Sequence, residues 1–464
     1  MASTERNVGS AKKTVAVVGS GLAGLATAHL LHSDRHQRYA VTVLECAANF
    51  SFDSASVAIR DESSKHIVER IDVPMRAFAL GYYNNLIRMY KYLDIQYNRQ
   101  RFIYTFSEKS TSAAPDPYFI HTSNNHRLPP IRPESANFVS WLFDIVYVAV
   151  CYLWWALCCF WVAPNPATRD RECESLEEYM RRIMLPRRFV QLYLLPLMAS
   201  VATCTHTALL QFPAADLIEY KKRSAGQQHF TVTELDQVQK KLGAGIPVRF
   251  STVVNKVEAT PDSKVRILSS TSNGASRDET FDHVVLAVAP GIVGKIYQPL
   301  EKAMSQIPST LVESVVQAGD ARLRRQSTCP APGHNAPHTL HFRTSATLAQ
   351  TESIHVYPSG AMVTTCPFND LSSAQNVLKS ASFHRGLRTT RSRRVVNDMF
   401  DDHPTAASYA VDEKPSSWRN GDENVWVVGG WCWDGMVLLE GCVVSAMRVA
   451  ESLGVHVPWR NQAI

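Results

Sequence analysis

The stretch that decides the fold runs from Thr14 to Glu45 and reads TVAVVGSGLAGLATAHLLHSDRHQRYAVTVLE. Its first apolar run, residues 15–18, predicts a short strand buried on both faces of a parallel sheet. Three glycines spaced GxGxxG follow, then a helical pattern over 22–31 and a second strand over 41–44 that ends in an acid. Strand, glycines, helix, strand and acid in this order predict a complete βαβ unit.

In such a unit each glycine has a physical role beside a dinucleotide. Gly19 permits the tight turn, Gly21 lets the backbone amides approach a pyrophosphate, and Gly24 lets the helix pack closely on the strand. Glu45 stands 21 residues beyond Gly24 and would accept hydrogen bonds from the ribose. This stretch alone leaves FAD and NAD(P) open, because both use the fold. The predicted cofactor loop consists of Gly19, Ser20, Gly21, Leu22, Ala23 and Gly24.

Composition excludes several other classes of protein. The 464 residues are 45% hydrophobic and 19% charged, which is typical of a globular chain with a large core. A net charge of +6, from 48 basic and 42 acidic residues, is too small to indicate nucleic-acid binding without a folded motif, and we find none. The ten cysteines form no CxxC pair and no spaced Cys/His set, so no metal site is predicted. Reduced cysteines and a polar N-terminus predict an intracellular protein.

Two polar features follow the βαβ unit. Residues 49–57 form a polar loop with three serines, and small hydroxyls there could serve a pyrophosphate. A strand over 68–73 precedes Arg76, which is a candidate for binding flavin carbonyls or an acidic substrate. The alternative is an ordinary solvated arginine, which is the commoner case.

Farther along, the basic run RGLRTTRSRR at 385–394 is interpreted as a solvated helix face.

The segment 138–163 is the most unusual in the chain. Residues 145–163 are 19 positions without a charge, and as a helix they would span roughly 28 Å. A transmembrane span, a membrane-docking helix and a buried core helix all fit this composition. Because the dinucleotide fold uses sequence from both sides of the segment, a single crossing would put its two halves on opposite faces. We therefore rank docking or burial above spanning.

The C-terminal half returns to the strand and glycine pattern. Residues 284–289 read as a buried strand, and 425–428 as another, followed by Gly429 and Gly430. Gly441 then leads a helix to about Leu453. The free amides of such a helix would face a bound anion or an electron-rich ring. A domain that binds only NAD does not need this second glycine-led helix.

At this point the chain resembles the FAD-dependent amine oxidase and phytoene desaturase superfamily, within it a branch of predicted FAD-binding oxidoreductases. The resemblance covers about residues 14–454 and rests on VAVVGSGLAGLATAHLL with Glu45, IDVPMRAFALGYYNNLIRMYKYL, YLLPLMASVATCTHTALLQFPA, FDHVVLAVAP and the tail VVGGWCWDG, LEG and SAMRVAESLG. It implies FAD as cofactor, with Val254 beside adenine and with Gly430, Glu440 and Gly441 near the ribityl chain and isoalloxazine. Trp431 and Trp433 are candidates for the walls at the flavin face, or are plain packing.

The resemblance implies an α/β fold in which a Rossmann-like FAD-binding domain of the amine-oxidase type is interleaved with an α+β substrate domain. The expected FAD domain comprises 12–75, 245–300 and 420–456, and the substrate domain comprises 76–244 and 301–419, including 138–163. The chain lacks a Gly/Arg turn after Glu45, and it has no lysine at a recognisable strand position where amine oxidases orient a water.

We therefore expect an FAD-dependent oxidoreductase that transfers a hydride from a hydrophobic small molecule to the flavin and passes the electrons to O2. One alternative is an FAD-dependent double-bond isomerase of a fatty-acid or terpenoid-like substrate, and another is a non-catalytic protein that keeps the fold. The expected location is the cytoplasmic side, with peripheral membrane association through 145–163.

Overall fold

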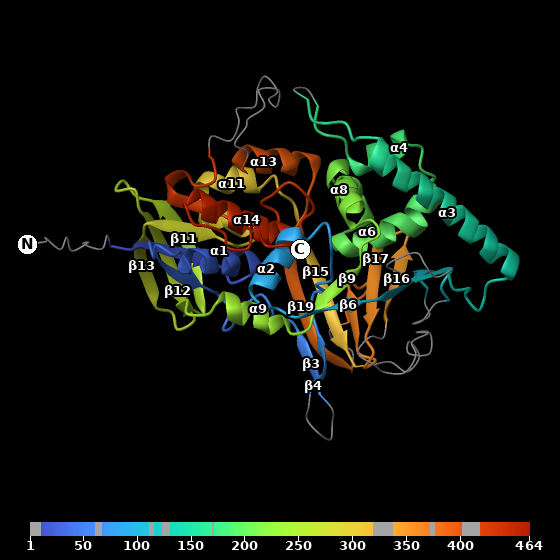
Figure 1. The fold of residues 1–464 in the computed structure, drawn as a ribbon, viewed down its shortest axis with the longest axis horizontal. Coiled ribbons are helices and arrows are strands. Elements are labelled where there is room, and N and C mark those ends of the chain that lie inside the picture. Colours follow the sequence, from blue (N-terminus) through green and yellow to red (C-terminus); the bar gives the residue numbers. More distant parts are fainter. Residues whose placement is uncertain are drawn as a thin grey trace, which may run out of the picture.

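The dinucleotide glycines lie at the carboxyl edge of a five-stranded parallel sheet (Figure 1). This computed structural model describes residues 11–60, 67–110, 116–122, 130–168, 171–318, 337–371, 376–400 and 418–464. The strands of the parallel sheet lie in the order β10 (Val248–Arg249), β2 (Tyr39–Leu44), β1 (Lys13–Val18), β14 (His283–Leu286) and β20 (Val425–Val427).

The continuous apolar run of β1 is explained by two separate cores. Val15 and Val17 pack in the core that contains α1 (Leu22–His32) and α14 (Leu439–Ser452), whereas Ala16 and Val18 pack in a second core on the other face. Because successive side chains of a strand point to opposite faces, a strand between two cores must be apolar throughout. The second core is built from α10 (Pro290–Ile296), α13 (Thr390–Phe400) and the antiparallel strands β11 (Thr252–Ala259), β12 (Val265–Thr271) and β13 (Ser276–Phe281).

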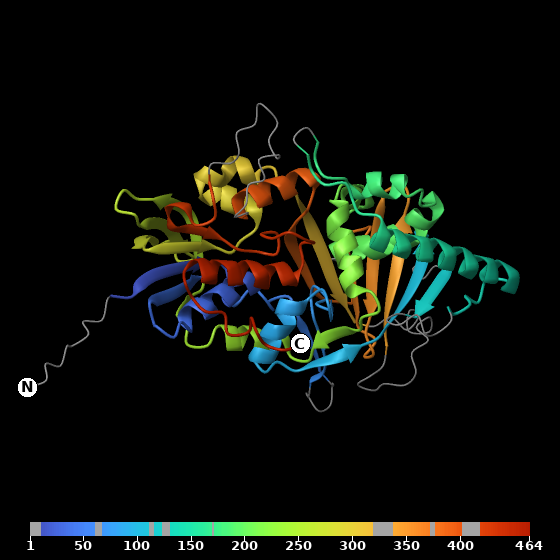
Figure 2. The same cartoon turned by 45° about the horizontal axis from the view of Figure 1, so that its top comes forward.

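A seven-stranded sheet forms the other half of the molecule (Figure 2). Its order is β19 (Val377–Gly386), β15 (Ser309–Gln317), β18 (Met362–Thr365), β17 (Gln350–Val356), β16 (His338–Ser345), β7 (Phe102–Glu108) and β8 (Phe119–Thr122). The helix α6 (Leu195–Ala202) packs on β16 and β17. Around it lie α4 (Leu176–Arg182), α7 (His206–Leu210) and α8 (Ala214–Ser224).

Smaller elements connect the two halves. The helix α2 (Asn84–Tyr92) packs against α14, and α9 (Leu235–Leu242) packs against α1. The hairpin β3 (Val57–Arg60) and β4 (Ile67–Ile71) projects from the body, and β5 (Phe78–Ala79), β9 (His229–Val232) and β6 (Tyr97–Gln100) form a three-stranded sheet.

The unusual apolar segment is one helix, α3 (Phe138–Trp161), along the outer edge of the molecule (Figure 1). Only four of its side chains are buried, namely Cys151, Trp155, Cys158 and Cys159. The interpretation of this segment as a buried core helix is therefore wrong for most of its surface. Within the described residues it is the one helix long and apolar enough to cross a membrane, judged by length and composition.

Candidate dinucleotide and substrate site

The glycine loop between β1 and α1 is shaped by two close approaches and one opening. Gly19 has a φ of +102°, and a Cβ there would lie 2.7 Å from the carbonyl oxygen of Ala287. A Cβ on Gly24 would overlap the carbonyl oxygen of Gly19. A Cβ on Gly21 would meet nothing within 4 Å. The first and third glycines are therefore required by packing, and the middle one faces open space where a pyrophosphate could approach.

The acid at the end of β2 supports this loop directly. Glu45 is buried, and its Oε2 accepts hydrogen bonds from the Ser20 amide at 2.8 Å and the Ser20 hydroxyl at 2.5 Å. Its Oε1 accepts from the Ala47 amide at 2.9 Å and the Cys46 thiol at 3.3 Å. Burial alone would raise the pKa of Glu45, but these hydrogen bonds outweigh it and the pKa is lowered.

Glu45 therefore stays ionised, and its roughly four acceptor positions are all used by the chain itself. A ribose could bind the carboxylate only by replacing a side-chain donor, either Ser20 or Cys46. The sequence suggested the ribose role, but the extra role of Glu45 as a brace for the glycine loop needed the structure. Ser51 joins this brace, because its amide donates to the Ser20 hydroxyl at 2.8 Å.

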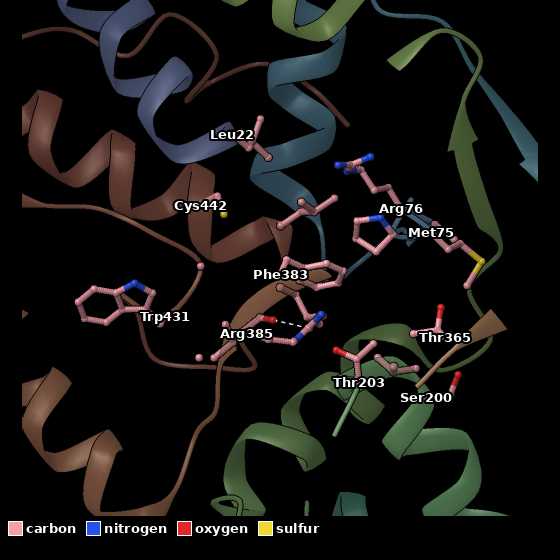
Figure 3. A pocket seen from close by; sticks show the side chains of 18 of the residues that line it. Leu22, Met75, Arg76, Ser200, Thr203, Thr365, Phe383, Arg385, Trp431 and Cys442 are labelled. Atoms are coloured by element: carbon pink, nitrogen blue, oxygen red, sulfur yellow. Dashed lines mark hydrogen bonds between the residues drawn. The ribbon is translucent and has the colours of Figure 1, made fainter. Parts of the chain in front are cut away.

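A cavity of about 440 Å³ begins at the glycine loop and continues into the half of the molecule that contains the seven-stranded sheet. This volume is in the range of small-molecule sites. Gly21, Leu22 and Ala23 form one end, and Figure 3 shows Leu22 among the lining side chains. The far walls are mainly apolar and aromatic and come from β7, β16 and α6: Phe102, Tyr104, Leu197, Val201, Leu340 and Phe342.

The N-terminus of α14 forms a second wall at the cofactor end. Leu438, Leu439 and Cys442 line the cavity, as does Gly430 from the turn after β20. Burial raises the pKa of the Cys442 thiol to about 12, although the amides of Gly430 and Ala23 partly oppose the shift. Cys442 is thus a neutral thiol between the N-termini of α1 and α14. The sequence analysis did not single out Cys442. Its position directly after Gly441, near the start of the expected helix, could have indicated a place at the site.

Three residues expected at the cofactor lie in other surroundings. Glu440 is buried and accepts hydrogen bonds from the amides of Asn85 at 2.9 Å and Leu86 at 3.0 Å, so it caps α2 rather than lining the cavity. A Cβ on Gly441 would overlap the Trp433 ring, which makes it a packing glycine. Trp433 itself does not line the cavity, and its Nε1 donates to the Met436 carbonyl at 3.0 Å. The resemblance implied a cofactor role for Glu440 and Gly441, and Trp433 was a candidate for a wall at the flavin face, but none of the three lines the cavity.

Two further candidates keep a place near the site. Trp431 is buried and lines the cavity beside Gly430 (Figure 3). Val254 is buried in the core with Val18 and Leu44 and does not line the cavity. Its strand starts beside the end of β2, where the Thr252 amide donates to the Glu45 carbonyl at 2.9 Å.

Arg76 is half-buried, lines the cavity and ties the polar loop to the site. It donates to the Phe52 carbonyl, and its guanidinium carbon lies 4.7 Å from the centre of the Phe52 ring. Burial lowers its pKa and Asp72 opposes the shift. Its Nη1 is buried without a hydrogen-bond partner among the described residues. Arg76 is therefore not a solvated surface arginine, and one of its nitrogens is free to bind an anionic or carbonyl oxygen.

The basic run at 385–394 is also not a solvated helix face, contrary to the sequence interpretation. Arg388 is 1% exposed and donates to the carbonyls of Trp431, at 3.0 Å, and Trp433. Asp216, on α8, lies 2.9 Å from Arg393 and 3.8 Å from Arg388. A buried carboxylate from a distant helix thus neutralises this part of the run, and the sequence spacing gave no sign of that pairing.

We expect Arg388→Met to lower the free energy of unfolding by about 3–5 kcal/mol, because it leaves Asp216 less compensated and frees the carbonyls of the 431–433 turn. Urea unfolding followed by circular dichroism measures this. Arg391→Ala is the matched control, since Arg391 is exposed, and should change stability by less than about 0.5 kcal/mol. Equal effects of the two substitutions would contradict the assignment.

Arg385 supplies a cation inside the cavity. It donates to the Val437 carbonyl at 2.7 Å, and within the described residues it forms no ion pair (Figure 3). Burial lowers its pKa, and the nearby ionisable groups that oppose this are thiols and a phenol: Cys204, Tyr83, Cys366 and Cys442. An arginine remains charged even so, so the cavity holds a positive charge that a negative group on a ligand could neutralise.

Comparison with known proteins agrees with this geometry. A family model described as an NAD(P)-binding Rossmann-like domain matches residues 17–93. No curated protein matches the chain. Among solved structures, the crystal structure of a CLA-producing fatty acid isomerase from P. acnes is similar, with a TM-score of 0.61 and 12% identity over 95% of this chain and 99% of that one.

The chain contains an NAD(P)-binding Rossmann-like segment over residues 17–93. The expected α/β fold class is thereby confirmed, with a Rossmann-like domain on a parallel sheet. At 12% identity the likeness to the isomerase concerns the fold alone. The match to the Rossmann-like family model supports a dinucleotide as the ligand of the glycine loop.

Proposed function

We propose that the protein is an FAD-dependent oxidoreductase that dehydrogenates a hydrophobic small molecule. The observation that carries the proposal is a single cavity with two different ends. One end has the open Gly21 backbone and the N-termini of α1 and α14, and the other has apolar and aromatic walls. The second helix N-terminus favours FAD over NAD(P), because a nicotinamide domain needs only the first.

In this proposal, some residues of the chain bind the cofactor and others exclude water from the reacting carbon. The amides of Leu22 and Ala23 would hold the pyrophosphate, and the α14 N-terminus would face the ring end. When bound, FAD supplies the hydride-accepting chemistry, with O2 as the expected electron acceptor. Phe102, Tyr104 and Phe342 would hold an apolar carbon in place and keep water away from it.

The test begins with the purified full-length chain. A flavin absorbance spectrum, with about one FAD released per chain on denaturation, is expected. A natively folded chain that neither contains nor binds added FAD would rule the proposal out. Bleaching of the flavin under anaerobic conditions by an extract of apolar metabolites, with recovery on admitting air, would separate an oxidase from an unreactive flavoprotein.

A double-bond isomerase is the second candidate, favoured by the fold likeness to the fatty acid isomerase. Isomerisation leaves no net change in the oxidation state of the flavin. Product formation without O2 and with the flavin oxidised at the end would therefore replace our proposal with this one. A third candidate, a non-catalytic protein that keeps the fold, would retain its biological role when FAD binding is abolished.

We expect Arg385 to raise the midpoint potential of the bound flavin. A cation in the same cavity as Gly430 and Cys442 would favour the more negatively charged reduced state. We expect Arg385→Met to retain bound FAD and to make its midpoint potential more negative by roughly 30–60 mV, equivalent to about 1.4–2.8 kcal/mol for two electrons. Redox titration with indicator dyes measures this without a substrate. Arg385→Lys should restore part of the shift, and an unchanged potential in Arg385→Met would contradict the role.

A further inference from the structure

The outer face of α3 is the largest concentration of exposed apolar side chains among the described residues. Of 21 large apolar residues with high exposure, eleven lie on this one helix. Val139, Val150 and Trp161 are 76%, 62% and 83% exposed. A surface this apolar on a folded chain marks a contact with a protein or a membrane.

The inner face of the same helix walls a second cavity, of about 460 Å³. Val148, Tyr152 and Trp155 line it. Five residues line both this cavity and the cofactor cavity: Tyr104, Leu197, Val201, Tyr220 and His229. The two cavities therefore adjoin, and α3 forms one wall of the second one.

Charges near α3 are arranged to suit an anionic surface. The helix α3 contains one charged residue, Asp144, whose Oδ1 lies 3.0 Å from Nη2 of Arg188. Arg187 and Arg188 are exposed next to a turn whose Met184 is 80% exposed. The Trp154 indole donates to the Ile183 carbonyl at 2.8 Å, which fixes this turn beside the helix. Apolar side chains flanked by arginines fit a bilayer that carries anionic lipid.

A second copy of the chain fits this face less well. In a twofold contact the same patch of both copies meets, and the acid of α3, Asp144, is already paired with Arg188 within the chain, so it offers no carboxylate to the other copy. Spanning also fits poorly. The Tyr179 hydroxyl donates to the carbonyls of Cys158 and Val162, both at 2.9 Å, and Trp155 and Cys159 are buried. A helix held to the body on one side can lie in the plane of a bilayer but cannot cross it without breaking these contacts.

We propose that α3 docks in the plane of a bilayer containing anionic lipid, and that apolar substrate passes between that bilayer and the cofactor cavity through the second cavity. The outer side chains lie among the acyl chains, and Arg187 and Arg188 contact lipid headgroups. Figure 2 shows α3 at the outer edge, with its N-terminal end projecting beyond the seven-stranded sheet. The route of the substrate rests on the proposed function, whereas the docking does not.

Docking is tested by flotation of the full chain with vesicles of phosphatidylcholine and phosphatidylglycerol at 3:1. We expect the wild-type chain to float, to float less with phosphatidylcholine alone, and to be released by alkaline carbonate. The triple variant Val139→Ser, Val150→Ser, Trp161→Ser should float at least tenfold less, with unchanged circular dichroism and flavin content. The matched control substitutes serine at Leu311, Leu348 and Leu378, which are 53%, 47% and 47% exposed away from α3, and should float normally.

Failure of the wild-type chain to float would overturn the docking, and a dimer in sedimentation equilibrium would then identify a second copy as the partner. Retention in the membrane after carbonate would also overturn it, in favour of spanning. Flotation of a chain that binds no FAD would refute the proposed function and leave the docking intact.

The route is tested with cis-parinaric acid as a fluorescent apolar probe supplied in the vesicles. The wild-type chain should take it up, measured as the probe that stays with the chain after the vesicles are removed. Val148→Trp, which fills the second cavity, should reduce uptake at least tenfold while flotation and thermal stability are kept. Val146→Trp is the matched control, because Val146 lies on the outer face of α3 and is 55% exposed, and it should leave uptake unchanged. Equal uptake by the two variants would overturn the route.

Discussion

Gly21→Val is expected to fold like the wild-type chain and to lose its flavin. A side chain at this position meets nothing within 4 Å, and the backbone, with φ −66° and ψ 175°, is extended and open to any residue. The valine would occupy the space through which a pyrophosphate reaches the α1 amides. We expect FAD affinity to fall at least ~100-fold, or about 2.7 kcal/mol. The ratio of flavin to protein absorbance after purification, and FAD titration of the apoprotein, measure it.

Gly24→Ala is the informative comparison, because its Cβ would overlap the Gly19 carbonyl. This variant should lose stability by about 1–3 kcal/mol, since the helix must move away from the strand. Gly21→Val should stay within about 1 kcal/mol of wild type in urea unfolding. Full FAD content in Gly21→Val would show that the cofactor does not use this loop.

Acid should strongly destabilise the half of the molecule that contains the seven-stranded sheet between pH 7.5 and 5.5. Four histidines in and around the seven-stranded sheet are buried or half-buried, and desolvation lowers the pKa of each to about 4: His206, His229, His338 and His341. In the unfolded chain they titrate near pH 6.5. The unfolded state therefore binds more protons below that pH, and stability falls as the pH is lowered from about 6.5 toward 4.

Each such histidine contributes about 1.4 kcal/mol of lost stability between pH 7.5 and 5.5, or about 5–6 kcal/mol for the four. Urea unfolding at the two pH values measures the total. His341 accepts or donates a hydrogen bond with Thr105 at 2.7 Å, and His341→Gln can keep that bond while removing the titration. The loss of stability between pH 7.5 and 5.5 should then be smaller by about 1.4 kcal/mol, the contribution of one histidine. His36→Gln, at an exposed position, should leave it unchanged, and a wild-type chain equally stable at both pH values would contradict the prediction.

The local features of the dinucleotide end were predictable because they depend on neighbours in sequence. A strand between two cores has to be apolar at every position, and β1 is. A turn and a helix that pack this closely must lack side chains at the contact, as do Gly19 in the turn and Gly24 in α1.

Side-chain partners far apart in the chain were not predictable. Glu440 follows the glycine turn, yet it binds the N-terminus of α2, about 355 positions away. Arg388 sits in a basic run, yet Asp216 and two tryptophan carbonyls hold it inside the protein. The sequence by itself determined the βαβ unit, its glycines and the length of the apolar helix, because backbone geometry and hydrophobic period are local. Only the tertiary structure decided which polar side chains face the cavity and which face of α3 stays uncovered, because both depend on elements that fold together from distant segments.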